Sequence, residues 1–271
     1  MENLVSRTLT AAVFTVGFLG CILFGKYTFV FLCLVIFTGC LWEFYEFFKK
    51  TETPPMILRG FLLGLALFIL TALYCLSFSK IPLFSFLAPL FFLFPISTLV
   101  FPRKENLVSS AITFWGIFYC VVPVCMFLWM GFIGSHGYSY HILLGFIFFI
   151  WVNDTGAYIF GNIFGKSTIY KKVSPGKTWE GFIGGAICAI VLGYFLTLYF
   201  HELNRIQWIV LAIIVVISGS LGDFVESLYK REINLKDSGK LFPGHGGMLD
   251  RFDSFLMAAP FVYFFLLLVK S

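Results

Sequence analysis

Long apolar stretches dominate the chain, and short segments between them hold most of the polar residues. Each stretch is continuous over roughly 20 residues rather than alternating, which is typical of helices that cross a membrane. Only helices and closed barrels satisfy the backbone within lipid, so a continuous apolar pattern favours helices. We predict spans at about 8–24, 27–43, 60–78, 82–101, 107–133, 141–163, 181–200, 206–225 and 255–269.

Composition supports this prediction. Of the 271 residues, 59% are hydrophobic and only 12% are charged, whereas a soluble domain has roughly 25% charged residues. The seven cysteines all fall within apolar spans without a CxxC pair, so they are predicted to be small buried hydrophobic residues. The expected fold is an all-α, polytopic integral membrane protein with about nine transmembrane helices and a cytoplasm-facing polar cavity.

The positive charges are distributed unevenly between the two predicted sides of the membrane. Of the 19 lysines and arginines, all but Lys26, Lys80, Arg205 and Lys270 fall in the N-terminus or in loops that follow even-numbered spans. Cytoplasmic loops carry the excess of such residues. The N-terminus and the polar loops are therefore predicted to be cytoplasmic, and the C-terminus to lie outside.

The acidic residues divide the chain into two regions. All five aspartates, and nine of the 14 acids, lie in the second half. We therefore expect residues 1–140 to form an N-terminal transmembrane scaffold and residues 141–271 a C-terminal transmembrane catalytic region. Transporters built from inverted repeats usually carry matching polar breaks in both halves, so this asymmetry counts against a transporter.

The first polar cluster, WVNDTGAYIFGNIFGKS, occupies residues 151–167. Asn153 and Asp154 lie near the middle of a predicted span, where burying a charge costs from about 2.5 kcal/mol upwards. Tyr158 is one turn further on, and Gly161 continues the same face and would let another backbone approach. The cluster is either a polar clamp between helices or the lining of a cavity, and the cavity is favoured.

The second cluster, KSTIYKKVSPGKTWEG, covers residues 166–181 and contains four lysines. Ser174 followed by Pro175 has the pattern of a helix N-cap with proline in the first helical position. A helix N-terminus beside lysines such as Lys177 can bind phosphate. The alternative is that these lysines only mark the cytoplasmic side.

The third cluster, SGSLGDFVESLYKR, places Asp223, Glu226 and Lys230 three and four residues apart, on one helical face. Two acids in this arrangement at the membrane edge can ligate a hard cation through oxygen. The alternative is a solvated helix end with a pair between Glu226 and Lys230.

The fourth cluster, KDSGKLFPGHGGMLDRFDS, precedes the last apolar span. Its PGHGG segment cannot be regular helix and predicts a glycine-built turn that exposes backbone N–H groups to an anion. Asp250 and Asp253 follow, three residues apart at a helix start, with Arg251 between them. Each residue alone has the ordinary interpretation of a cap or a loop turn.

Carboxylates and lysines together indicate a phosphate substrate with a bridging metal. Magnesium takes one or two carboxylates and fills its other positions with phosphate oxygens and water. Two phosphate groups that must react repel each other, by about 4 kcal/mol for each pair of unit charges at about 4 Å and an effective dielectric of about 20. Positioning and charge neutralisation then supply most of the catalysis. An enzyme with so many spans is expected to have a lipid substrate.

These residues resemble a known family, the phosphatidate cytidylyltransferases (CDP-diacylglycerol synthases). The segment SPGKTWEG is similar to a conserved segment of that family, apart from Gly176, where a lysine is usual. The resemblance covers residues 151–254. Its long signature is matched by Ser227-x-x-Lys230-Arg231, Lys236-Asp237-x-Gly239, Pro243-x-His245-Gly246-Gly247 and Asp250-Arg251-x-Asp253.

The resemblance implies a magnesium-dependent reaction of CTP with phosphatidate that gives CDP-diacylglycerol and pyrophosphate. It also implies a homodimer in the bacterial inner membrane, with no nucleic acid partner. By analogy, Asp223 and Asp250 would hold the metal, with a second cation such as K⁺ nearby. His245 would either contact the leaving pyrophosphate or only shape the turn. The residues expected in catalysis are Asp223, Lys230, His245, Asp250 and Arg251. Those expected to bind substrate are Asp154, Ser174, Lys177, Glu226, Arg231, Lys236, Asp237, Gly246, Gly247 and Asp253.

Two rival functions stay open. A CTP-dependent polyprenol or dolichol kinase would share the membrane site, metal and nucleotide but would transfer the γ-phosphate. An ion or lipid transporter would show flux without a requirement for CTP.

Overall fold

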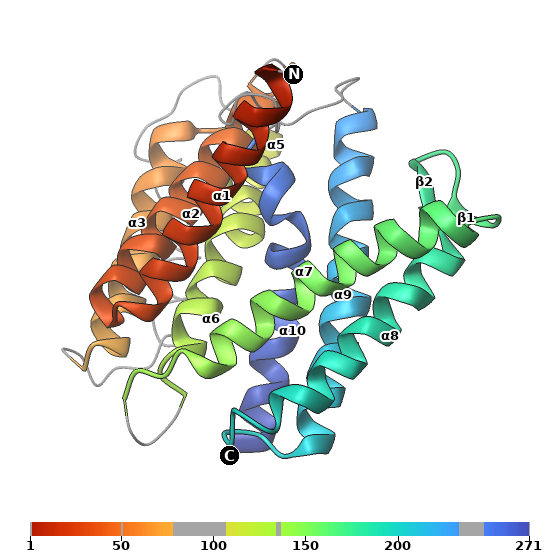
Figure 1. The fold of residues 1–271 in the computed structure, drawn as a ribbon. Helices are drawn as coiled ribbons and strands as arrows, with labels where there is room; N and C mark the ends of the chain where they lie inside the picture. The colour runs from red at the N-terminus through yellow and green to blue at the C-terminus, as the bar shows by residue number, and fades with distance from the viewer. Residues whose placement is uncertain (1, 50, 78–106, 134–136, 233–246, 271) are drawn as a thin grey trace. The chain divides into compact units, whose positions relative to one another are not determined.

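The computed structural model describes residues 2–49, 51–77, 107–133, 137–232 and 247–270, with side chains from residue 12 onward. Figure 1 shows a helical protein with one short β-hairpin among these residues. The helices are α1 (Glu2–Leu23), α2 (Lys26–Phe48), α3 (Ile57–Cys75), α5 (Leu107–Gly116), the π-helical turn η1 (Ile117–Val121), α6 (Val122–Met130), α7 (His141–Phe164), α8 (Trp179–Leu196), α9 (Arg205–Glu232) and α10 (Leu249–Lys270). The strands are β1 (Thr168–Tyr170) and β2 (Ser174–Thr178).

Membrane-spanning helices make up most of this structure. Seven segments in the described part are long and apolar enough to cross a membrane, with α5, η1 and α6 counted as one. The part of α1 whose side chains are described, Ala12–Leu23, is also apolar. Eight of the nine predicted spans coincide with these helices, and the span predicted at 82–101 lies outside the described residues. The prediction of an all-α, polytopic membrane protein is confirmed.

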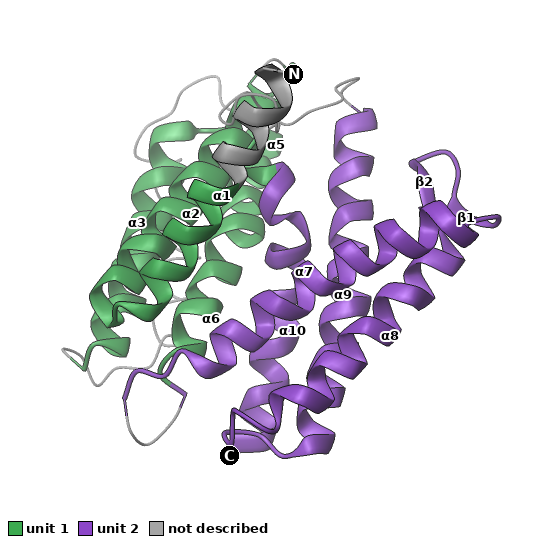
Figure 2. Cartoon of the chain, in the orientation of Figure 1, with its two compact units in different colours: residues 1–132, 238–249 green, residues 133–237, 250–271 purple. Residues whose placement is uncertain are grey.

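The chain forms two compact units, coloured separately in Figure 2. Unit 1 consists of residues 1–132 and 238–249, and unit 2 of residues 133–237 and 250–271. The predicted division at residue 140 assigned a scaffold role to the first region and a catalytic role to the second. The two compact units do not show which region is catalytic, so that division stays a prediction.

Unit 1 is organised around Tyr45 of α2, which is fully buried. Its hydroxyl donates to the backbone oxygen of Thr113 in α5 at 2.9 Å, and the Thr113 hydroxyl accepts from the backbone N–H of Met56 at 2.8 Å. Gly60 and Gly116 lie against the Tyr45 ring, where a side chain would collide with it. A polar hydroxyl is thus satisfied inside an apolar core, which avoids the cost of an unpaired polar group in lipid.

The span at 107–130 is continuous but irregular. Pro123 stands in the first turn of α6, and a proline inside a helix cannot donate to the carbonyl four residues earlier and clashes with it. That carbonyl belongs to Tyr119, within the π-helical turn η1. The wider turn accommodates the proline without ending the span, as π-bulges commonly do within helices.

In unit 2, glycines bring α7 and α8 into close contact. A methyl group added at Gly156 would lie 3.1 Å from the α-carbon of Gly185, and one added at Gly181 would lie 2.7 Å from the backbone oxygen of Ala157. Gly161 also lies against α8, near Gly181. Small residues at such positions let helix backbones approach in a membrane. The predicted role of Gly161 in a close helix contact is confirmed.

The same device joins α9 to α10. Gly219 lies against Ser254, and Gly222 lies against the backbone oxygen of Asp253, leaving no room for a side chain. This contact brings the acidic part of α9 beside the first turns of α10. It therefore determines which charged side chains can meet.

The prediction that Ser174 caps a helix is wrong. Ser174–Thr178 is strand β2, which pairs antiparallel with β1 in a hairpin between α7 and α8. Pro175 is tolerated because each strand of a two-stranded sheet has a free edge. The cap is Thr178, whose side chain accepts from the backbone N–H of Gly181 at 3.1 Å.

The glycine contact predicts a selective effect of small substitutions. Gly185→Ala would place a methyl group 2.7 Å from both oxygens of Asn153, and such overpacking costs about 1–3 kcal/mol. We expect a lower melting temperature in detergent. The matched control is Gly17→Ala in α1, where nothing lies within 4 Å. A melting temperature equal to that of the wild type for Gly185→Ala would contradict the packing described.

Candidate active site

Charged side chains on α9 and α10 form an ion-pair cluster in unit 2. Asp223, Glu226 and Lys230 lie on one helix, as predicted, because α9 continues beyond the predicted end of its span to Glu232. The Lys230 ammonium lies 2.7 Å from Glu226 Oε2 and 2.9 Å from Asp250 Oδ1. Glu226 is 1% exposed. One lysine therefore pairs with two carboxylates, one of which is almost fully buried.

Asp223 has partners from two other elements. Lys177 of β2 donates to Asp223 Oδ2, and the Ser254 hydroxyl of α10 donates to Asp223 Oδ1 at 2.8 Å. The Lys177 ammonium also lies 4.6 Å from the ring centre of Phe224, within cation–π range. The hairpin between α7 and α8 thus brings a lysine to a carboxylate of α9.

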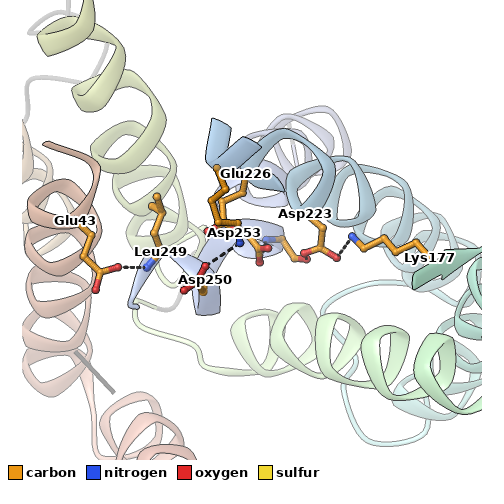
Figure 3. Close-up of polar contacts among 9 residues, drawn as sticks. Glu43, Lys177, Asp223, Glu226, Leu249, Asp250 and Asp253 are labelled. Atoms are coloured by element: carbon orange, nitrogen blue, oxygen red, sulfur yellow. Dashed lines mark hydrogen bonds and ion pairs between the residues drawn. The ribbon is translucent and has the colours of Figure 1, made fainter. Parts of the chain in front are cut away.

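Asp253 lies between the ion pairs of Lys230 and the contacts of Asp223. Its side chain is close enough to interact electrostatically with both Asp223 and Glu226, and its Oδ1 accepts from the backbone N–H of Ser254 at 2.6 Å. Figure 3 shows these carboxylates as neighbours on α9 and α10, with Lys177 reaching Asp223. The four carboxylates of α9 and α10 and the two lysines thus form one cluster.

A pocket of about 270 Å³ opens beside Asp223. Its polar lining comes from α7, the hairpin and α9, and includes Asp154 and Lys177. Asn153, which is 6% exposed, has a side-chain oxygen with no hydrogen-bond partner in the described part of the chain. The residues that line the pocket are Asn153, Asp154, Ala157, Tyr158, Ile169, Gly176, Lys177, Thr178, Gly181, Phe182, Ser220, Asp223 and Phe224.

The cluster is rich in carboxylates. Asp223, Glu226, Asp250 and Asp253 lie in it, and the ammonium groups of Lys177 and Lys230 pair with three of them. Carboxylate oxygens are the ligands that a hard cation prefers, so the chemistry of these side chains suits such an ion. Among the described residues, no group of three or more His, Cys, Asp or Glu side chains is arranged as a metal site.

The structure brings together several of the predicted site residues. Asp154, Lys177 and Asp223 share the pocket, while Glu226, Lys230 and Asp250 share ion pairs, with Asp253 between the two groups. For the other described members of the predicted set, the structure gives their exposure. Arg231 and Arg251 are exposed, Ser174 is half-buried in β2, and Gly247 is buried. Lys236, Asp237, His245 and Gly246 lie outside the described residues.

Two polar residues with defined partners were not predicted. Ser254 is a direct partner of Asp223, and its place after Asp253 in the sequence gave no sign of it, because serine is common at helix starts. Glu43 is a buried acid in α2, bonded to the backbone N–H of Leu249 at 2.8 Å. An acid within an apolar span is itself a signal, but the predicted end of its span at residue 43 placed it at the membrane surface.

Comparison with known proteins decides the family. Residues 5–269 match the model of the cytidylyltransferase family. The chain belongs to this family. It is 34% identical to the phosphatidate cytidylyltransferase of Staphylococcus haemolyticus over 258 residues, which cover 94% of this chain and 95% of that protein. It is also 47% identical to the phosphatidate cytidylyltransferase of Staphylococcus saprophyticus over 128 residues, 46% of this chain and 48% of that protein. The predictions of the family and of a nucleotidyltransferase enzyme are confirmed.

The ion pairs predict a large cost for removing the shared lysine. Lys230→Met would leave Glu226 and Asp250 without this cation, and breaking a buried pair in this way costs about 3–5 kcal/mol. We expect a clear drop in melting temperature in detergent. The control is Lys49→Met, which breaks an exposed pair with Glu46 and should cost less than about 1 kcal/mol. Equal losses in the two variants would contradict the account.

Proposed function

We propose that this cytidylyltransferase transfers the CMP group of CTP to phosphatidate. A phosphatidate oxygen attacks the α-phosphorus of CTP, the bond from that phosphorus to the bridging oxygen of the β-phosphate breaks, and pyrophosphate leaves. The products are CDP-diacylglycerol and pyrophosphate. The observation that carries this proposal is the cluster of carboxylates and lysines inside membrane-spanning helices, together with similarity to phosphatidate cytidylyltransferases over nearly the whole chain.

The placement of the cluster supports a lipid acceptor. Lys177 comes from a hairpin at the end of two membrane-spanning helices, whereas Asp223 and Asp154 lie within such helices. A charged pocket at this position can meet the headgroup of a lipid whose acyl chains remain in the bilayer. A water-soluble acceptor would not require charges to be buried in this way, at the cost of several kcal/mol that such burial usually carries.

Magnesium fits the residues present. Carboxylate oxygens are abundant in the cluster, with Asp223 on α9 and Asp250 on α10, and magnesium takes one or two carboxylates and completes its shell with phosphate oxygens and water. Asp223 and Asp250 are the proposed holders, with a second cation such as K⁺ near the same acids. When bound, the ion would offset the negative charge of the reacting phosphates.

The remaining residues have supporting roles in this proposal. Lys177 orients a phosphate group in the pocket, which Asp154 also lines. Lys230 keeps Asp250 and Glu226 in place and, by its charge, lowers the repulsion that an incoming phosphate meets. We assign phosphate binding to Lys236, which follows α9 in the sequence, and to the exposed Arg231 of α9 and Arg251 of α10.

The PGHGG segment is assigned to the site from its sequence. Gly246 and Gly247 would admit the triphosphate close to the backbone, and Asp237 is also assigned to substrate binding. His245 would contact the leaving pyrophosphate or hold the turn. We further propose a homodimer in the bacterial inner membrane, with the N-terminus and the site on the cytoplasmic side, where CTP is available.

The proposal predicts transfer of label from α-³²P-CTP into lipid by the purified protein with phosphatidate and Mg²⁺. EDTA should abolish transfer, and added Mg²⁺ should restore it. Asp250→Asn should lower the rate by about a hundredfold or more, as expected when an electrostatic group at the reacting centre is lost. Glu232→Gln, which changes an exposed acid at the end of α9, should leave the rate unchanged.

Two outcomes would contradict the proposal. Transfer from γ-labelled CTP to a lipid alcohol, without transfer from α-labelled CTP, would indicate a kinase. Silence in both assays from folded protein, with ion or lipid flux in vesicles, would indicate a transporter.

A further inference from the structure

Glu43 is a deeply buried acid in a membrane-spanning helix of unit 1. It belongs to α2 and is 6% exposed. Its position inside the helix, with α2 continuing to Phe48, means that the carboxylate cannot simply reach water. An ionisable group kept at such a place usually has a functional role and a defined partner.

The Glu43 carboxylate contacts the first residue of α10. The backbone N–H of Leu249, a residue that is 2% exposed, donates to Glu43 Oε2 at 2.8 Å (Figure 3). The first N–H groups of a helix have no partner within the helix, and negative charge is favoured there by the helix dipole. Glu43 therefore acts as an N-cap supplied by another helix.

A second contact of α2 fixes the same segment. Gly39 lies one turn before Glu43, and a methyl group there would be 3.0 Å from the Met248 side chain. Met248 is 3% exposed. Because Gly39 and Glu43 are four residues apart, they lie on one face of α2. That face leaves space for Met248 and supplies the hydrogen-bond acceptor for Leu249.

We propose that Glu43 is a positioning residue for the transfer reaction. Asp250 follows Leu249 by one peptide bond, so the residue that fixes the Leu249 N–H also fixes where α10 starts and how its first aspartate is presented. The inference rests on the function proposed above, since the role of Asp250 is part of that proposal. In this proposal Glu43 acts on the reaction through Leu249, not by contact with substrate.

The test compares two substitutions that differ in one property. Glu43→Gln keeps an oxygen that can accept from Leu249, whereas Glu43→Leu has a similar size without an acceptor. We expect Glu43→Leu to lower kcat by about tenfold to a hundredfold, the range for loss of a hydrogen bond to a charged group. Glu43→Gln should retain most of kcat. The KM for CTP should stay within about twofold in both variants, because neither removes a contact to the nucleotide.

Glu46→Gln is the matched control, since it changes an exposed acid on the same helix. It should leave kcat and KM unchanged. Wild-type kcat in Glu43→Leu would overturn the proposal. An equal loss in Glu43→Gln and Glu43→Leu would also overturn it, because the charge rather than the hydrogen bond would then be what matters.

A second readout does not depend on activity. Hydrogen–deuterium exchange of the peptide that begins at Gly247 should be faster in Glu43→Leu than in the wild type, and unchanged in Glu46→Gln. Faster exchange in a protein that shows no CMP transfer would sink the proposed function and leave the Glu43 contact standing. Unchanged exchange in Glu43→Leu would contradict the positioning role, whatever the activity.

Discussion

Compensation of charge inside membrane-spanning helices is the constraint on which the site depends. Lys230 lies between Glu226 and Asp250, and Lys177 bonds to Asp223. Each ion would be expensive to bury alone, and each pair is tolerable only because its geometry is close and its remaining oxygens find donors such as Ser254. In the function proposed above, these carboxylates hold a cation and, through it, phosphate.

Helix packing makes this arrangement possible. Glycines remove the side chains that would keep α7 from α8 and α9 from α10, so Lys230 of α9 can approach Asp250 of α10 within ion-pair distance. The hairpin between α7 and α8 then returns Lys177 to the Asp223 side of the pocket. The glycines at the helix contacts are thus as necessary to the cluster as its charged residues.

The sequence predicted the helical membrane fold and the acidic face of α9, because both depend on local periodicity. The 3.6-residue repeat places Asp223, Glu226 and Lys230 on one face whatever surrounds them. The local conformation at Ser174 was predicted wrongly, since a Ser-Pro pair suits a helix start and a strand edge equally well, and pairing with β1 decides between them.

Contacts that join distant segments could not be predicted. The partner of Glu43 is 206 residues away in the sequence, and no local pattern connects α2 to the start of α10. Ser254 was missed for the same reason, because its hydroxyl meets Asp223 on another helix. The reaction was predicted from the resemblance to known cytidylyltransferases. The structure then showed which acids and lysines are bonded to one another.

Binding of Mn²⁺ in place of Mg²⁺ tests the central claim most directly, because it requires no turnover. Electron paramagnetic resonance would measure free Mn²⁺ in the presence of protein and a non-reactive CTP analogue in detergent. The account predicts that the wild type and Glu232→Gln bind the ion, and that Asp223→Asn and Asp250→Asn lose most of that binding. Unchanged binding in both aspartate variants would show that the buried cluster is not the centre that holds the metal and nucleotide.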